Sequence, residues 1–201
     1  MTTPLLEMKN VVIEGFSGDT WAPIIKGLDL NLHKGEVLGL IGESGAGKST
    51  FGLASMAYTR QGCRIASGSI VFDGRELFGA PESELRELRG ARIAYVAQSA
   101  AASFNPAHRL IRQYAEAPVQ HGIMSNAEAE EKAVATYEQL LLPDPENIGY
   151  RFPHQVSGGQ LQRAMVAMAM SCQPDIIIFD EPTTALDVTT QIEVLAAIKE
   201  I

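Results

Sequence analysis

Residues 42–50 of the chain read Gly42-Glu43-Ser44-Gly45-Ala46-Gly47-Lys48-Ser49-Thr50. It matches the pattern G-x-x-x-x-G-K-[ST], whose glycines let the backbone approach an anion while successive amide N–H groups point at it. The apolar run at residues 36–41 has the length of a buried strand, and residues 50–56 can open a helix. Strand, glycine-rich turn and helix N-terminus together predict a phosphate-binding loop and argue against a flexible surface turn.

Two side chains of this loop have distinct expected roles. Lys48 is expected to bind the β- and γ-phosphates of a nucleoside triphosphate, because its positive charge offsets the charge of the phosphates. The hydroxyl of Ser49 is expected to ligate Mg²⁺. The remaining loop residues, 42–47 and Thr50, are expected to contact the same phosphates.

A second motif follows the most strand-like segment of the chain, residues 175–179. Asp180 and Glu181 come directly after it. Downstream of a phosphate loop, Asp180 is expected to hold Mg²⁺ through water, and Glu181 to polarise the attacking water as general base. An acidic cap on a strand is the alternative interpretation. The two motifs together predict a nucleoside triphosphatase.

Strand and helix patterns alternate along the rest of the chain. Short strands are predicted at residues 5–14, 24–33, 67–74 and 93–97, and helices at 157–170 and within an Ala- and Glu-rich insertion at 109–150. This alternation predicts an α/β fold, in which ligands bind at the carboxyl ends of the strands.

Composition limits the remaining possibilities. The 201 residues are 46% hydrophobic and 20% charged with a net charge of −8, which suits one folded domain and argues against a nucleic-acid-binding surface. Cys63 and Cys172 lack metal-ligand spacing and are expected to be reduced thiols. No leader is visible and no apolar run reaches the ~20 residues of a membrane span, so we expect a soluble cytoplasmic chain that reaches a membrane through a partner.

The family is indicated by Val156-Ser157-Gly158-Gly159-Gln160, followed by Leu161-Gln162-Arg163. Ser157 can cap the helix behind it, and the amides of Gly158 and Gly159 then face outward as a second anion site. Alone, Ser-Gly-Gly would indicate only the start of a helix. In this order with the two other motifs, it resembles the signature motif of ATP-binding cassette (ABC) proteins, with Val in place of the usual Leu.

The resemblance implies a head-to-tail dimer that binds ATP with Mg²⁺ between its subunits. Residues 157–160 would contact the γ-phosphate held by the opposite subunit. Gln98 would sense Mg²⁺, belong to the catalytic residues and couple to a membrane partner. Asp187, in Thr184-Ala185-Leu186-Asp187, would lie in the loop that crosses the dimer interface. Phe16 would stack on adenine, with Trp21 as its rival.

The resemblance also implies a P-loop NTPase fold with a mostly parallel core sheet, N-terminal antiparallel strands and a helical subdomain. We expect one domain over 1–201, with a core at 1–98 and 157–201 and the helical subdomain at 99–156. All four histidines precede Glu181 and the chain stops within an apparent helix at 191–201, so the family's later strand and its γ-phosphate histidine are expected to be absent. We therefore expect a longer chain, of which this piece alone would be unstable and nearly inactive.

Residues 5–10, 98–106 and 151–155 together resemble the dipeptide, oligopeptide and nickel importer ATPases, with departures at Phe104, Gln155 and Val156. This implies an importer ATPase at the cytoplasmic face of the inner membrane, peripheral to permease subunits, paired with itself or a paralogous ATPase and served indirectly by an extracytoplasmic solute-binding protein. ATPases of phosphonate breakdown share the pattern. A soluble non-transport ATPase and a non-hydrolysing regulatory module also stay open, although Glu181 argues against the latter. The sequence does not name the solute.

Overall fold

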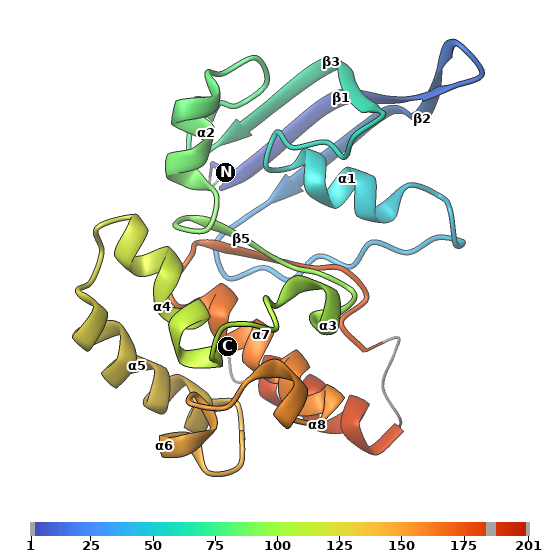
Figure 1. Ribbon diagram of the computed structural model, residues 1–201. Helices are drawn as coiled ribbons and strands as arrows, with labels where there is room; N and C mark the ends of the chain where they lie inside the picture. The colour runs from blue at the N-terminus through green and yellow to red at the C-terminus, as the bar shows by residue number, and fades with distance from the viewer. Residues whose placement is uncertain (1–2, 184–187, 200–201) are drawn as a thin grey trace. The chain divides into compact units, whose positions relative to one another are not determined.

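A computed structural model describes residues 3–183 and 188–199 of the chain (Figure 1). The chain forms two compact units, Met1–Arg86 and Glu87–Ile201. The predicted division into a core at 1–98 and 157–201 and a helical subdomain at 99–156 stays a prediction.

The first unit is built on an antiparallel sheet of four strands in the order β2-β1-β3-β4. β1 pairs with β2 on one side and with β3 on the other, so it is a central strand of the sheet. The strands are β1 (Leu6–Ser17), β2 (Thr20–Leu32), β3 (Cys63–Phe72) and β4 (Arg75–Glu76). The N-terminal antiparallel strands expected from the sequence are therefore present.

An irregularity in β1 keeps its apolar side chains on one face. Leu6 and Met8 are buried, and after a register shift the buried positions are Val11 and Ile13. An inserted residue of this kind would otherwise turn the next side chains to the wrong face. Opposite the shift, Gly68 has φ +113 and a Cβ there would lie 2.7 Å from the Cα of Val11, so glycine permits the close approach of β3.

Residues 36–41, predicted as the strand before the phosphate loop, form no strand, and that prediction is wrong. The amide of Glu36 donates back to the carbonyl of His33 at 3.2 Å, and the side chains of Val37 and Ile41 are 97% and 100% exposed. An apolar run becomes a strand only where a neighbouring strand pairs with its backbone. Among the described residues, no strand pairs with this run.

The second unit contains the parallel strand pair β5 (Ile93–Val96) and β6 (Ile176–Phe179). Their register runs from Ile93 opposite Ile176 to Val96 opposite Phe179. At the start of the pair, Arg92 Nε lies 2.7 Å from Asp175 Oδ2. At its end, the amide of Asp180 donates to the carbonyl of Val96 at 2.9 Å, so the ladder continues into the acidic motif.

Helices make up the rest of this unit (Figure 1). The predicted insertion at 109–150 is helical, and the predicted helix at 157–170 is present as α7. The helices of this unit are α3 (Ala100–Ser103), α4 (Leu110–Gln120), α5 (Asn126–Gln139), α6 (Pro145–Ile148), the 3-10 helix η1 (Pro153–Gln155), α7 (Gly158–Met170) and α8 (Val188–Lys199). Helix α1 (Lys48–Ala54) belongs to the first unit, and the division between the two units falls within α2 (Glu82–Leu88).

The core of the second unit gathers side chains of α4, α5 and α7. Tyr114 of α4 and Tyr137 of α5 are both 1% exposed and meet edge to face with ring centroids 5.7 Å apart. The hydroxyl of Tyr114 lies 2.9 Å from Thr136 Oγ1, and burial raises the pKa of both phenols. Across the described part of the chain, none of the helices has the length and apolar character of a membrane span.

Candidate nucleotide-binding site

The phosphate loop turns sharply into α1 at Gly47. This residue is the N-cap of α1 and has φ +87, in the left-handed region that side chains other than glycine rarely adopt. A Cβ there would lie 2.9 Å from Ile25 Cδ1 and 3.0 Å from Ile24 Cγ2. Backbone conformation and packing against β2 thus both require the glycine that the motif supplies.

The side chain of Lys48 bonds back to the start of the loop. Its Nζ donates to the carbonyl oxygens of Gly42 at 2.8 Å and of Glu43 at 2.9 Å. Among the described residues, no group accepts a hydrogen bond from the amides of Gly45 or Gly47. Exposed amides beside a lysine ammonium suit phosphate oxygens, so the residues present fit a nucleoside triphosphate.

The two candidate aromatic residues lie side by side at the tip of the hairpin. Phe16 and Trp21 are cross-strand partners with ring centroids 5.2 Å apart, and both are partly exposed. The guanidinium carbon of Arg64, from β3, lies 4.2 Å from the Trp21 ring centroid. Arg64 is in turn paired with Glu14 at 2.7 Å. The adenine-stacking role of Phe16 stays a prediction, and Trp21 is held in place by more contacts.

In the second unit, the two acidic residues after β6 differ in environment. Asp180 is 8% exposed, and its Oδ2 accepts a hydrogen bond from the Tyr95 hydroxyl at 2.5 Å. Glu181 is exposed and has φ +46, which turns the chain sharply after the strand. A buried, held carboxylate suits the expected metal role, and an exposed carboxylate suits contact with water.

Gln98 and Glu181 come together although 83 residues separate them. The side-chain amide of Gln98 donates to Glu181 Oε2 at 3.3 Å. The parallel pairing of β5 with β6 explains this, because Gln98 follows β5 as Glu181 follows β6. The carboxylate proposed as the base therefore has a side-chain amide beside it that can fix its orientation.

Ser157 caps α7 as predicted. Its Oγ accepts a hydrogen bond from the amide of Gln160 at 3.3 Å, and the amide of Ser157 donates to Gln160 Oε1 at 3.0 Å, which makes a reciprocal capping box. A Cβ at Gly158 would meet nothing within 4 Å, so α7 is open at this residue. Gly159 is buried, so the expectation that both glycines face outward holds for Gly158 alone. The first amides of a helix have no partner within the helix and can bind an anion there.

The predicted residues are distributed over both units. Phe16 and the phosphate loop, with Ser49 and Thr50, belong to the first unit, whereas Gln98, Asp180, Glu181 and residues 157–160 belong to the second. Asp187 lies outside the described residues. Sequence reasoning missed Arg64 and Tyr95. No local pattern marks them, because each becomes part of the site only through strand pairing with distant segments.

The chain is similar in sequence to known proteins. The ABC transporter family matches residues 25–184. The chain is 39% identical over 197 residues to the oligopeptide transport ATP-binding protein OppD of Escherichia coli, covering 98% of this chain and 58% of that protein. It is 39% identical over 199 residues to the metal-staphylopine import system ATP-binding protein CntD of Staphylococcus aureus, covering 98% and 72%. The chain spans about 60% of the length of the first relatives it matches.

Solved structures agree as well. The dimeric ATP-binding cassette MJ0796, in a post-hydrolysis state bound to ADP and Pi, superposes with a TM-score of 0.84 at 26% identity, over 97% of this chain and 82% of that one. A second dimeric structure of MJ0796, a bacterial ABC transporter cassette, gives 0.83 at 26% identity, over the same shares of both chains. The predicted P-loop NTPase fold is thereby confirmed, and the chain belongs to the ABC transporter family of ATP-binding cassettes.

Proposed function

We propose that this chain binds ATP with Mg²⁺ and hydrolyses it as the ATPase subunit of an ABC importer. The observation that carries the proposal is the phosphate loop, in which Lys48 closes on two carbonyls and the Gly45 and Gly47 amides stay available for phosphate oxygens. A triphosphate bound there gains charge-assisted hydrogen bonds from the ammonium and dipolar ones from the loop.

The proposed roles are divided between the phosphate loop and the residues that follow the carboxyl ends of β5 and β6. Ser49 and Asp180 would hold Mg²⁺, which supplies positive charge against the phosphates. Glu181 would accept a proton from the attacking water, and the amide of Gln98 would keep the carboxylate turned toward it. Tyr95 holds the Asp180 carboxylate in one orientation through its hydroxyl.

The signature residues would act in a dimer. Residues 157–160 form the first turn of α7, with Ser157 and Gly158 exposed, which suits the γ-phosphate held by the opposite subunit of a head-to-tail dimer. Both structures of MJ0796 named above are dimeric, which supports this proposal. Asp187 is proposed to lie at the same interface, and the second subunit would be this chain or a paralogous ATPase.

Transport of peptides or similar small solutes is proposed from the relatives. Proteins named for the transport of oligopeptides and of metal-staphylopine share 39% identity with this chain. The partners would be membrane permease subunits and, indirectly, an extracytoplasmic solute-binding protein, with the ATPase at the cytoplasmic face of the membrane. No observation favours the non-transport or phosphonate-breakdown alternatives.

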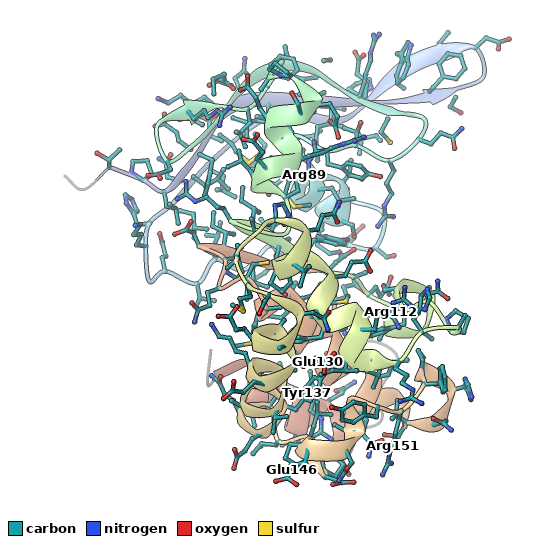
Figure 2. The ribbon with its side chains drawn as sticks, turned by 60° about the vertical axis from the view of Figure 1, so that its left-hand side comes forward. Arg89, Arg112, Glu130, Tyr137, Glu146 and Arg151 are labelled. Atoms are coloured by element: carbon teal, nitrogen blue, oxygen red, sulfur yellow. The ribbon has the colours of Figure 1, made fainter. Side chains whose placement is uncertain are left out.

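The hydrolysis step is tested by Glu181→Gln in the native protein. An amide has the shape of the carboxylate but cannot accept the proton of water, so ATP should bind normally while turnover falls by about 100-fold or more. Glu146→Gln on α6, an exposed carboxylate labelled in Figure 2, is the matched control and should leave turnover unchanged. Unchanged hydrolysis in Glu181→Gln would show that Glu181 is not the base.

The transport partner is tested by cross-linking from Ser103. This residue is exposed at the end of α3, so a cysteine there should be accessible. Its hydroxyl donates only to the carbonyl of Ser99 within the same turn, at 2.9 Å, among the bonds of the described residues. We expect Ser103→Cys to cross-link to a cytoplasmic loop of a permease subunit in membranes. Cross-links found solely to a soluble protein would instead favour the non-transport class.

A further inference from the structure

The first turn of α4 is capped by a distant part of the chain. The amide of Leu110 donates to the carbonyl of Arg151 at 3.0 Å, and the amide of Ile111 donates to the carbonyl of Gly149 at 2.7 Å. The N-cap residue Arg109 provides no side-chain hydrogen bond. Backbone carbonyls of residues 149–151 therefore satisfy amides that every helix leaves without an internal partner. In Figure 2, Arg112 marks α4 and Arg151 marks the capping segment.

One side chain fastens another loop to the same turn. Gln113 is 7% exposed, its Oε1 accepts from the amide of Asn105 at 2.8 Å, and its Nε2 donates to the carbonyls of Asn105 at 3.1 Å and His108 at 3.0 Å. Both the donor and the acceptor of this buried amide are thus used on residues 105–108. This loop follows α3 in the segment that begins at Gln98.

The capping segment, residues 149–151, continues through residues 152–155 to the signature residues 157–160, and it is closely packed. A Cβ at Gly149 would lie 3.0 Å from Tyr137 and 3.2 Å from Ile111 Cβ, so the segment is pressed against α4 and α5. The amide of Phe152 donates to Gln155 Oε1 at 2.8 Å and closes η1. The Phe152 ring stacks on His154 at 5.6 Å. Residues 149–155 therefore form a short, well-fastened connection that ends two residues before Ser157.

We propose that Gln113 is a positioning residue for the signature segment. Through three hydrogen bonds it ties residues 105–108 to the first turn of α4, and through the Leu110 and Ile111 amides that turn sets the place of residues 149–155 and of Ser157 beyond them. This rests on the proposed function insofar as residues 157–160 serve the γ-phosphate.

The test is Gln113→Leu in the native protein, followed by amide hydrogen exchange without nucleotide. The leucine removes the hydrogen bonds of Gln113 to the Asn105 amide and to the His108 carbonyl, while the Asn105 carbonyl keeps the His108 amide at 3.2 Å. Exchange should therefore rise about tenfold at residues 104–108 and also at 149–157. Exchange at residues 42–50 should stay unchanged. In turnover assays kcat should fall several-fold while KM for MgATP stays within about twofold, because the phosphate loop is untouched. Gln120→Leu, exposed at the end of the same helix, is the control and should change none of these quantities.

A second variant tests the connection from its other end. Gly149→Ala crowds Tyr137 and Ile111, and because coupling between two sites is reciprocal, it should raise exchange at residues 104–108. If Gln113→Leu prevents folding, the exchange of residues 104–108 in Gly149→Ala tests the proposal instead. The proposal is overturned if each variant raises exchange on its own side alone. Exchange is measured without nucleotide, so this failure is distinct from a failure of the proposed ATPase function, which the Glu181→Gln variant detects.

Discussion

Ser157 and Ser125 are the N-cap residues of α7 and α5 and make the same hydrogen-bond pattern. Substituting each in turn therefore distinguishes the effect of losing a helix cap from an effect on nucleotide chemistry. In each case the serine Oγ accepts from the amide three residues later at 3.3 Å. The serine amide donates to the side chain of that residue, at 3.0 Å to Gln160 and at 2.8 Å to Glu128. We compare Ser157→Ala at α7 with Ser125→Ala at α5.

The two substitutions should cost similar stability. Loss of an N-cap serine destabilises a helix by about 1 kcal/mol, and a loss of that size lowers the melting temperature by about 2–4 °C in a domain of this length. Ser125→Ala should lie at the larger end, because its Oγ also donates to Glu128 Oε2 at 2.7 Å. Capping alone therefore predicts two nearly equal melting shifts.

Turnover should distinguish them. Ser157→Ala also removes a hydroxyl from the open turn proposed to face the γ-phosphate, so the ATP-dependent dimer should weaken and kcat should fall about tenfold or more. Ser125→Ala should keep kcat within about twofold. Melting curves and steady-state ATPase rates on the native protein are the assays. Equal losses of turnover in both variants would refute a nucleotide role for Ser157 beyond helix capping.

Three further predictions follow from local geometry. Gly47→Ala places a Cβ 2.9 Å from a β2 isoleucine at φ +87, and titration should show weaker ATP binding, since a left-handed alanine costs about 1–2 kcal/mol. Burial raises the pKa of Cys172, so mass spectrometry should find Cys63 alkylated first and Cys172 only after unfolding. Burial raises the pKa of Glu76, but hydrogen bonds from Ser69 and three amides outweigh it and hold the pKa below its ordinary value. That stabilisation is present at neutral pH and is lost as pH falls through the folded pKa, so the melting difference between the native protein and Glu76→Gln should shrink in acid.

Much of the fold was predictable because its signals are local. The apolar runs that became β5 and β6 are both short and bounded by polar residues, and the Ser-x-x-Glu and Ser-x-x-Gln patterns mark the starts of α5 and α7. The strand predicted at 36–41 failed although its sequence resembles β6. Strand formation depends on a pairing partner elsewhere in the chain, and an apolar run does not reveal whether one is present.

The candidate site likewise contains residues that the sequence predicts and residues that it does not. The phosphate loop, the acidic pair and the signature residues are contiguous, so their spacing alone predicts their chemistry. Tyr95, whose hydroxyl donates to Asp180, lies on β5, which pairs with β6. Arg64, whose guanidinium lies over Trp21, lies on β3, which is separated from β2 by β1. The contacts of Gln113 depend on how loops fold back onto α4. No sequence pattern marks these residues, since each acquires its role from tertiary contacts.

Binding of the ATP phosphates by Lys48 and its loop can be measured by titration. MgATP affinity is measured for the native protein, for Lys48→Ala and for Lys34→Ala, which removes the same charge from an exposed position of the same unit. We predict that Lys48→Ala weakens binding by tenfold or more, equivalent to at least ~1.4 kcal/mol, and that Lys34→Ala leaves it unchanged. Equal affinity in the native protein and Lys48→Ala would contradict the account.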